Sequence, residues 1–244
     1  MITTTHTESF FSAEPDSEKS RPKLRSLEQH SVPAIKRGGA PRWLMIWFWA
    51  CIVIAVAAAT RRFIVLIGPS DPGAVMSGLN AAFASRTMLT LAHIIPATAF
   101  VLLIPFVLFR VPGQKRLERT LLLLGVTVAI TAYAMSVDAF GGWTERSAVL
   151  FFNSLFLFSL GKAFLYGLAG AVIPQRRWLV RSIGVLLGIA TTRPVMGVFF
   201  ATSQLTHLEP KQFFGIAFWI GFSINTIAVE VWLWARNPFT GCYG

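Results

Sequence analysis

The sequence contains few charged residues for its length. Only 14% of its 244 residues are Asp, Glu, Lys or Arg, whereas a soluble domain usually contains about 25%. Long stretches of the chain therefore carry no charge, and 54% of all residues are hydrophobic. This composition excludes an ordinary soluble domain and is typical of a protein embedded in a lipid bilayer.

Cysteine and histidine are also scarce. Cys51 and Cys242 are the only cysteines, so they form neither a disulfide framework nor a CxxC metal motif, and we expect two free thiols. A membrane haem held by two histidines needs a second histidine in an apolar segment, but only His93 lies in one. HExxH and P-loop motifs are absent. We therefore predict no metal, no cofactor and no catalytic residue. Whether the protein is an enzyme stays open, and the balance is against it.

Apolar segments dominate the rest of the chain. Each is close to the ~20 residues that a helix needs to cross ~30 Å of hydrocarbon. Because the backbone must satisfy its own hydrogen bonds in lipid, runs of this length form helices. We predict an all-α, polytopic transmembrane helix bundle with about six spanning helices, at residues 43–60, 87–109, 120–137, 147–173, 178–200 and 212–235. Alternatively, the first helix continues through Arg61 and Arg62, whose long side chains can reach the headgroups.

Polar segments flank and interrupt this transmembrane domain, which we place at residues 43–236. Residues 1–42 are rich in Ser, Thr, Glu, Pro and Lys and show no apolar periodicity, so they are predicted to be a disordered, basic tail. Residues 237–244 form a short second tail. In the first outer loop, Ser70–Asp71–Pro72 resembles a helix start. We expect one short interfacial helix at 72–85.

Basic residues determine the predicted orientation. The formal net charge of +11 comes mostly from residues in the first tail and in two of the connections. The positive-inside rule then places both termini in the cytoplasm and the protein in the cell membrane. Such charges fit anionic lipid headgroups better than nucleic acid. We assign Arg176, Arg177 and Arg181 to an inner loop that faces these headgroups.

Ionisable residues within the apolar segments are the candidate ligand or proton sites. Such residues are costly in lipid and normally face a bundle interior or a cavity. Estimated depths indicate two clusters, an outer one of His93, Asp138 and Arg193 and an inner ion pair of Lys162 with Glu230. Polar residues at helical spacing extend the clusters, and small residues indicate close helix packing. The polar set includes Thr127, Thr131, Ser159, Ser223 and Thr226; the small set includes Gly184 and Gly188.

Several short motifs resemble those of a known family. Residues 175–182 read Gln-Arg-Arg-Trp-Leu-Val-Arg-Ser, Thr191–Thr192–Arg193 follow in the next helix, and the last helix carries Asn225 and Glu230. This pattern resembles the predicted bacterial membrane protein family called domain of unknown function 2306, although Gln175 stands where that family tends to have His. The resemblance implies a multi-helix protein of the bacterial inner membrane with no assigned activity. It brings His93, Arg181, Arg193, Asn225 and Glu230 forward as the residues to test.

Three functional hypotheses follow. The leading one is a non-enzymatic bundle that binds a small ligand or conducts protons through its buried polar residues, with His93 as the group that titrates near neutral pH. The second is a membrane redox component that binds haem or quinone. The third is a structural or regulatory membrane subunit. The sequence does not decide among them.

Overall fold

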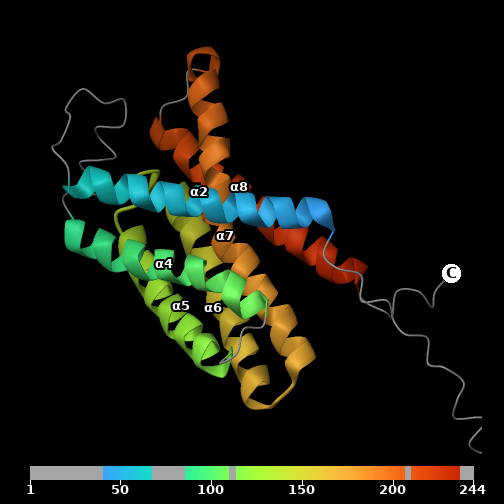
Figure 1. Ribbon diagram of the computed structural model, residues 1–244. Helices are drawn as coiled ribbons and strands as arrows, with labels where there is room; N and C mark the ends of the chain where they lie inside the picture. The colour runs from blue at the N-terminus through green and yellow to red at the C-terminus, as the bar shows by residue number, and fades with distance from the viewer. Residues whose placement is uncertain (1–40, 68–85, 110–113, 207–209, 237–244) are drawn as a thin grey trace, which may run out of the picture. The chain divides into compact units, whose positions relative to one another are not determined.

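The computed structural model describes residues 41–67, 86–109, 114–206 and 210–236. These residues form six helices: α2 (Arg42–Ile67), α4 (Thr87–Leu108), α5 (Gln114–Ser136), α6 (Gly142–Leu168), α7 (Val172–Thr206) and α8 (Pro210–Ala235) (Figure 1). All six are long and apolar enough to cross a membrane. The predicted multi-pass, all-α architecture is therefore confirmed. The predicted interfacial helix at 72–85, the tail up to residue 40 and the segment 237–244 lie outside the described residues.

The helix boundaries differ from the predictions by five residues or more at six ends: the end of α2, the start of α5, and both ends of α6 and α7. Helix α2 continues through Arg61 and Arg62, as the alternative required. Helix α6 ends at Leu168 because Gly170 adopts φ 69°, and the N–H of Ala171 bonds the carbonyl of Tyr166 at 2.9 Å. This is the usual glycine-terminated helix end. Helix α7 consequently starts earlier than predicted. Its first turns contain Arg176, Arg177 and Arg181, so their assignment to a loop was wrong.

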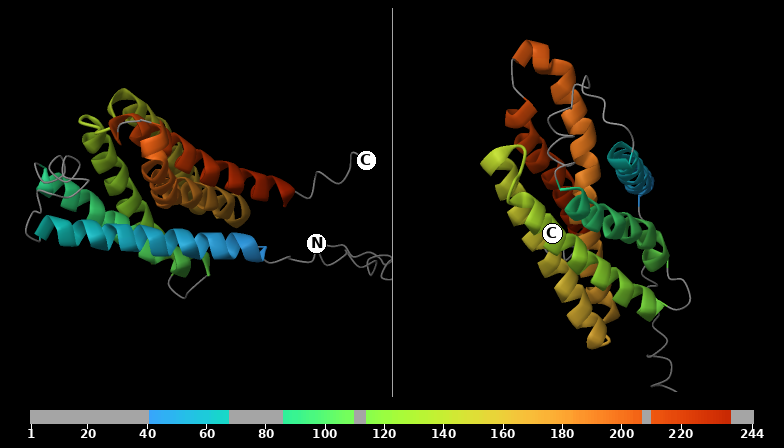
Figure 2. Two further views of the ribbon diagram at one scale, coloured as in Figure 1. Left: turned by 90° about the horizontal axis from the view of Figure 1, so that it is seen from above. Right: turned by 90° about the vertical axis from the view of Figure 1, so that its left-hand side faces the viewer.

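The helices pack through apolar faces. Helix α7 contacts α8, α6 and α2, whereas α4 contacts α5 and α2 (Figure 2). Aromatic rings fill much of the interior: Phe152 of α6 stacks on Phe222 of α8 at 5.1 Å between centroids. Large apolar side chains also cover the outside, including Ile46 (70% exposed) and Leu123 (69% exposed). An apolar exterior of this kind is what lipid contact requires.

Glycines bring α7 and α8 especially close. A Cβ atom added to Gly188 would lie 2.8 Å from the Cα atom of Phe222, and one added to Gly184 would lie 2.5 Å from a methyl carbon of Val229. Real Cβ atoms do not approach other atoms so closely, so only glycine fits at these positions. The expectation that Gly184 and Gly188 serve helix packing is confirmed.

Candidate functional site

Arg181 of α7 and Glu230 of α8 form a two-point ion pair. Arg181 donates from Nε to Oε1 of Glu230 at 2.5 Å and from Nη2 to Oε2 at 2.9 Å. The Arg181 side chain is 26% exposed and that of Glu230 is 48% exposed. Paired guanidinium and carboxylate groups neutralise each other, which reduces the free-energy cost of holding either within a membrane. The pair therefore links α7 to α8 and places two polar side chains between otherwise apolar helices.

The prediction that Lys162 pairs with Glu230 was wrong. The Lys162 Nζ instead lies 5.8 Å from the centroid of the Phe158 ring on its own helix. Depths estimated from the sequence had placed Lys162 and Glu230 in the same half of the bundle. The Glu230 carboxylate pairs instead with Arg181 of α7. Sequence reasoning singled out Glu230 correctly and missed its partner.

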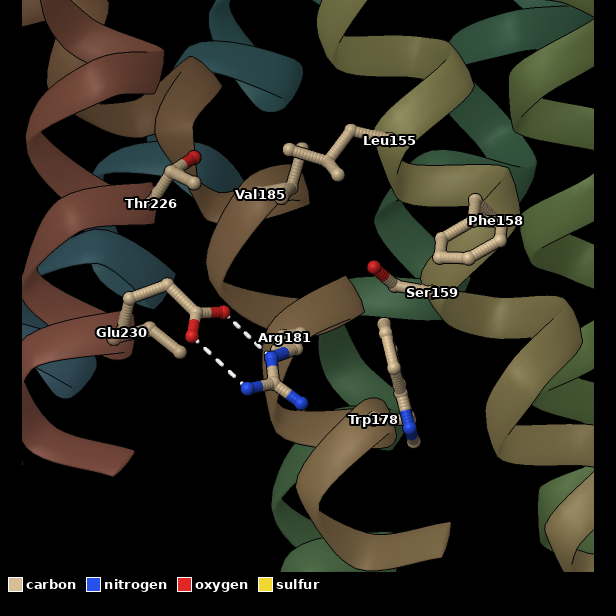
Figure 3. A pocket seen from close by; sticks show the side chains of 9 residues that line it. Leu155, Phe158, Ser159, Trp178, Arg181, Val185, Thr226 and Glu230 are labelled. Carbon is tan, nitrogen blue, oxygen red and sulfur yellow. Dashed lines mark hydrogen bonds and ion pairs between the residues drawn. The ribbon is translucent and has the colours of Figure 1, made fainter. Parts of the chain in front are cut away.

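A cavity of about 260 Å³ lies beside this ion pair, between α6, α7 and α8. Figure 3 shows the Arg181–Glu230 pair at one end of the cavity and the Ser159 hydroxyl directed into it from α6. Most of the remaining wall is apolar or aromatic. The lining residues are Leu155, Phe158 and Ser159 of α6, Trp178, Arg181 and Val185 of α7, and Thr226, Val229 and Glu230 of α8.

Ser159 is the unusual member of this lining. Its side chain is 1% exposed, yet its hydroxyl has no hydrogen-bond partner. Buried polar groups in proteins are nearly always hydrogen-bonded, because an unpaired one costs about 1–3 kcal/mol. By contrast, the hydroxyl of Ser182, which is 0% exposed, bonds the carbonyl of Leu179 at 2.8 Å. The unpaired hydroxyl therefore marks the cavity as a place where a polar atom from outside the chain fits.

Aromatic rings form the adjoining wall. The rings of Phe158 and Trp178 meet edge to face, with centroids 5.5 Å apart. The Arg181 guanidinium lies over the Trp178 ring at 4.6 Å, a favourable cation–π distance. The indole thus holds the guanidinium in place from one side while Glu230 holds it from the other.

Side chains at the start of α7 donate hydrogen bonds to α4, α5 and α8. Gln175 donates to Glu118 of α5 at 2.8 Å, and Arg176 donates to the carbonyl of Leu108 at the end of α4 at 3.1 Å. Arg177 donates to the carbonyl of Leu233 near the end of α8 at 3.3 Å. Since the last carbonyls of a helix lack partners within it, such donors stabilise helix ends. Arg176 and Arg177 thus make protein contacts that the headgroup assignment did not anticipate.

The predicted outer cluster does not form. Asp138 makes an ion pair with Arg86. His93 of α4 hydrogen-bonds the Thr131 hydroxyl of α5 at 2.9 Å. Arg193 makes no hydrogen bond or ion pair with any residue that the structure describes. His93 and Asp138 thus both make their contacts between α4 and α5, with Thr131 and Arg86, whereas Arg193 belongs to α7, so the predicted grouping of the three was wrong.

Asn225 belongs to a separate buried network. Its Oδ1 accepts hydrogen bonds from the Trp47 indole at 2.9 Å and from the Thr191 hydroxyl at 3.0 Å. Its Nδ2 lies 3.9 Å from the Sγ of Cys51. This network joins α2, α7 and α8. Asn225 is therefore best understood as a helix-packing residue rather than a ligand site.

Comparisons with models of protein families, with curated proteins and with solved structures found no match. The resemblance to the family described above stays a prediction. Among the residues that the structure describes, no group of His, Cys, Asp or Glu side chains lies close enough to hold a metal ion. The chemistry that the site itself offers is hydrogen bonding to a small molecule against an aromatic wall.

Proposed function

We propose that this multi-pass membrane protein binds a small ligand in the cavity between α6, α7 and α8, and that binding rather than catalysis is its activity. The buried, unpaired hydroxyl of Ser159 is the observation that supports this proposal. A packed structural interface would have closed on that hydroxyl or replaced it with an apolar group, since either change relieves the cost of an unpaired donor. The nearby ion pair adds a fixed polar contact.

Proton conduction receives less support from the same geometry. His93 contacts the Thr131 hydroxyl, and that hydroxyl also bonds the carbonyls of Thr127 and Val128 on its own helix. A relay toward Glu230 would need further titratable or hydroxyl groups in line with this contact. The described hydrogen bonds of His93 and Thr131 lead instead to the α5 backbone.

Extraction of the purified protein tests the proposal. Compounds that copurify with the wild-type protein are extracted into organic solvent and identified by mass spectrometry. The Ser159→Leu variant fills the cavity, so a compound held there is lost. Ser154→Leu, the same change at an exposed position on the same helix, is the control and retains it. The proposal is wrong if no compound depends on Ser159.

We further propose that both termini lie in the cytoplasm and that the basic residues near the ends of the helices contact anionic lipids. Lys115, Arg116 and Arg119 in the first turns of α5 and Arg236 after α8 support this orientation. Reporter fusions measure it directly: green fluorescent protein at either terminus fluoresces only inside the cell, and alkaline phosphatase is active only outside it. Active alkaline phosphatase at either end would reverse the assignment.

A further inference from the structure

The cavity also indicates which chemical class of ligand it takes. We infer that it accepts the head ring of a lipid-soluble quinone, a neutral flat ring with two carbonyl oxygens and an apolar tail. This inference rests on the proposed function, because it assumes that the cavity between α6, α7 and α8 is a binding site. Four properties of the lining support it: its hydrogen-bonding groups, its shape, its charge and the apolar surface beside it.

One unused hydrogen-bond donor faces the cavity. The Ser159 hydroxyl has no partner, whereas Arg181 uses Nε and Nη2 for Glu230. The third polar group, the Thr226 hydroxyl, already donates to the carbonyl of Phe222 at 2.8 Å. Because this free hydroxyl can donate, the matching ligand presents an acceptor atom, as a quinone carbonyl does.

The wall beside this donor suits a flat ring. Trp178 and Phe158 present aromatic surface, while Leu155, Val185 and Val229 complete an apolar lining. Aromatic rings favour stacked or edge-to-face contact with another ring. At about 260 Å³ the cavity is slightly smaller than the sites that enclose a whole drug-sized molecule. It therefore fits the head of a ligand better than the entire molecule.

The charge of the lining selects a neutral ligand. Arg181 and Glu230 are the charged members of the lining, and they neutralise each other through two hydrogen bonds. An ionic ligand would have to break that pair or remain uncompensated in a poorly solvated site, and both are costly. A carbonyl oxygen accepts from Ser159 while the ion pair stays intact.

Apolar exterior surface adjoins the cavity. Phe158 of the lining is 55% exposed, and on α8 Ile227 and Val231, which precede and follow Glu230 along the helix, are 61% and 59% exposed. Apolar side chains with this exposure face acyl chains in a membrane protein. A ligand can therefore enter sideways from the bilayer and leave an apolar tail among the lipids, which a water-soluble ligand would not do.

Fluorescence titration of the full-length protein in phosphatidylcholine nanodiscs tests the inference with decylubiquinone as the probe. We expect saturable quenching of tryptophan fluorescence, and the Trp178→Phe variant should lose most of it because that indole lines the cavity. Ser159→Ala should weaken binding about tenfold, the loss of one hydrogen bond. The Arg181→Lys variant, which retains the charge opposite Glu230, should also bind more weakly.

Two controls make the result specific. Ser182→Ala removes a buried hydroxyl that does not line the cavity, so its affinity for decylubiquinone should equal that of the wild type. Decylbenzene has the ring and the tail without carbonyl oxygens and should show no saturable quenching. Equal binding of the two probes, or an unchanged affinity of Ser159→Ala, would overturn the quinone assignment. If extraction yields another compound that depends on Ser159, the ligand class is wrong but the binding function stands; if it yields none, both are wrong.

Discussion

Arg181 and Glu230 meet through two parallel hydrogen bonds, of 2.5 and 2.9 Å, across the α7–α8 interface. The Glu230 carboxylate on α8 thus pairs with an arginine on α7 and not with Lys162 on α6, which the sequence had placed at a comparable depth. Arginine suits this role because its planar guanidinium matches both carboxylate oxygens at once.

Breaking this ion pair from either side should destabilise the protein. Glu230→Gln and Arg181→Gln each leave one charge without its partner, and we expect a loss of about 2 kcal/mol in the free energy of unfolding. The double variant should lose less than the sum of the two. Unfolding in mixed detergent micelles, followed by circular dichroism, measures all three. As a matched control, Lys162→Met should cost under about 1 kcal/mol, since it removes only a cation–π contact. Strong coupling of Lys162→Met with Glu230→Gln would instead support the Lys162–Glu230 ion pair predicted from the sequence.

Gly188 should tolerate no side chain. The Gly188→Ala substitution places a methyl group 2.8 Å from the Cα atom of Phe222, so α7 and α8 must separate. We expect a loss of about 1–3 kcal/mol, as for other overpacked interiors. Gly197→Ala, on the same helix with no atom within 4 Å of the added carbon, should be neutral or slightly stabilising. Thermal unfolding of the two variants in detergent compares them, and equal midpoints would refute the close α7–α8 contact.

Asn225 should be required for stability rather than for ligand binding. Asn225→Leu leaves the Trp47 indole and the Thr191 hydroxyl without their acceptor, and we expect a loss of about 2 kcal/mol. Thr226→Val, one residue further along α8, removes a hydroxyl that bonds a carbonyl of its own helix and should cost little. Chemical denaturation measures the stability of each variant. Unaltered stability of Asn225→Leu would mean that this network does not hold α2 against α7 and α8.

His93 should act as a link between α4 and α5. The His93→Leu and Thr131→Val substitutions remove the same hydrogen bond of 2.9 Å, so their effects on unfolding should not be additive. We expect a coupling energy of about 0.6–1 kcal/mol, the usual size for hydrogen bonds between membrane helices. Thr127→Val serves as the control, because that hydroxyl bonds the Leu123 carbonyl of its own helix. Additive effects of His93→Leu and Thr131→Val would show that the bond contributes nothing.

The sequence predicts where the helices are but not which side chains pair between them. Apolar length alone located the six helices of the described residues that are long enough to span a membrane, because a backbone in lipid has few alternatives to a helix. The end of α6 was misplaced because a positive φ at Gly170 stops the helix within an apolar stretch, where hydropathy gives no signal. Partner assignments such as Lys162 with Glu230 failed for a different reason: depth along a helix fixes one coordinate, whereas contact also depends on the rotation of each helix about its axis.

The apolar segments of the sequence by themselves thus determined that this chain is a multi-pass helical membrane protein. They also singled out Glu230 and His93 as ionisable residues that need partners, while the family resemblance brought Asn225 forward. Only the tertiary structure decided who those partners are. Trp47 and Asn225 are 178 residues apart in the chain, and no local pattern connects them. The cavity beside Ser159 likewise lies between three helices, and its shape depends on the packing of all their side chains together.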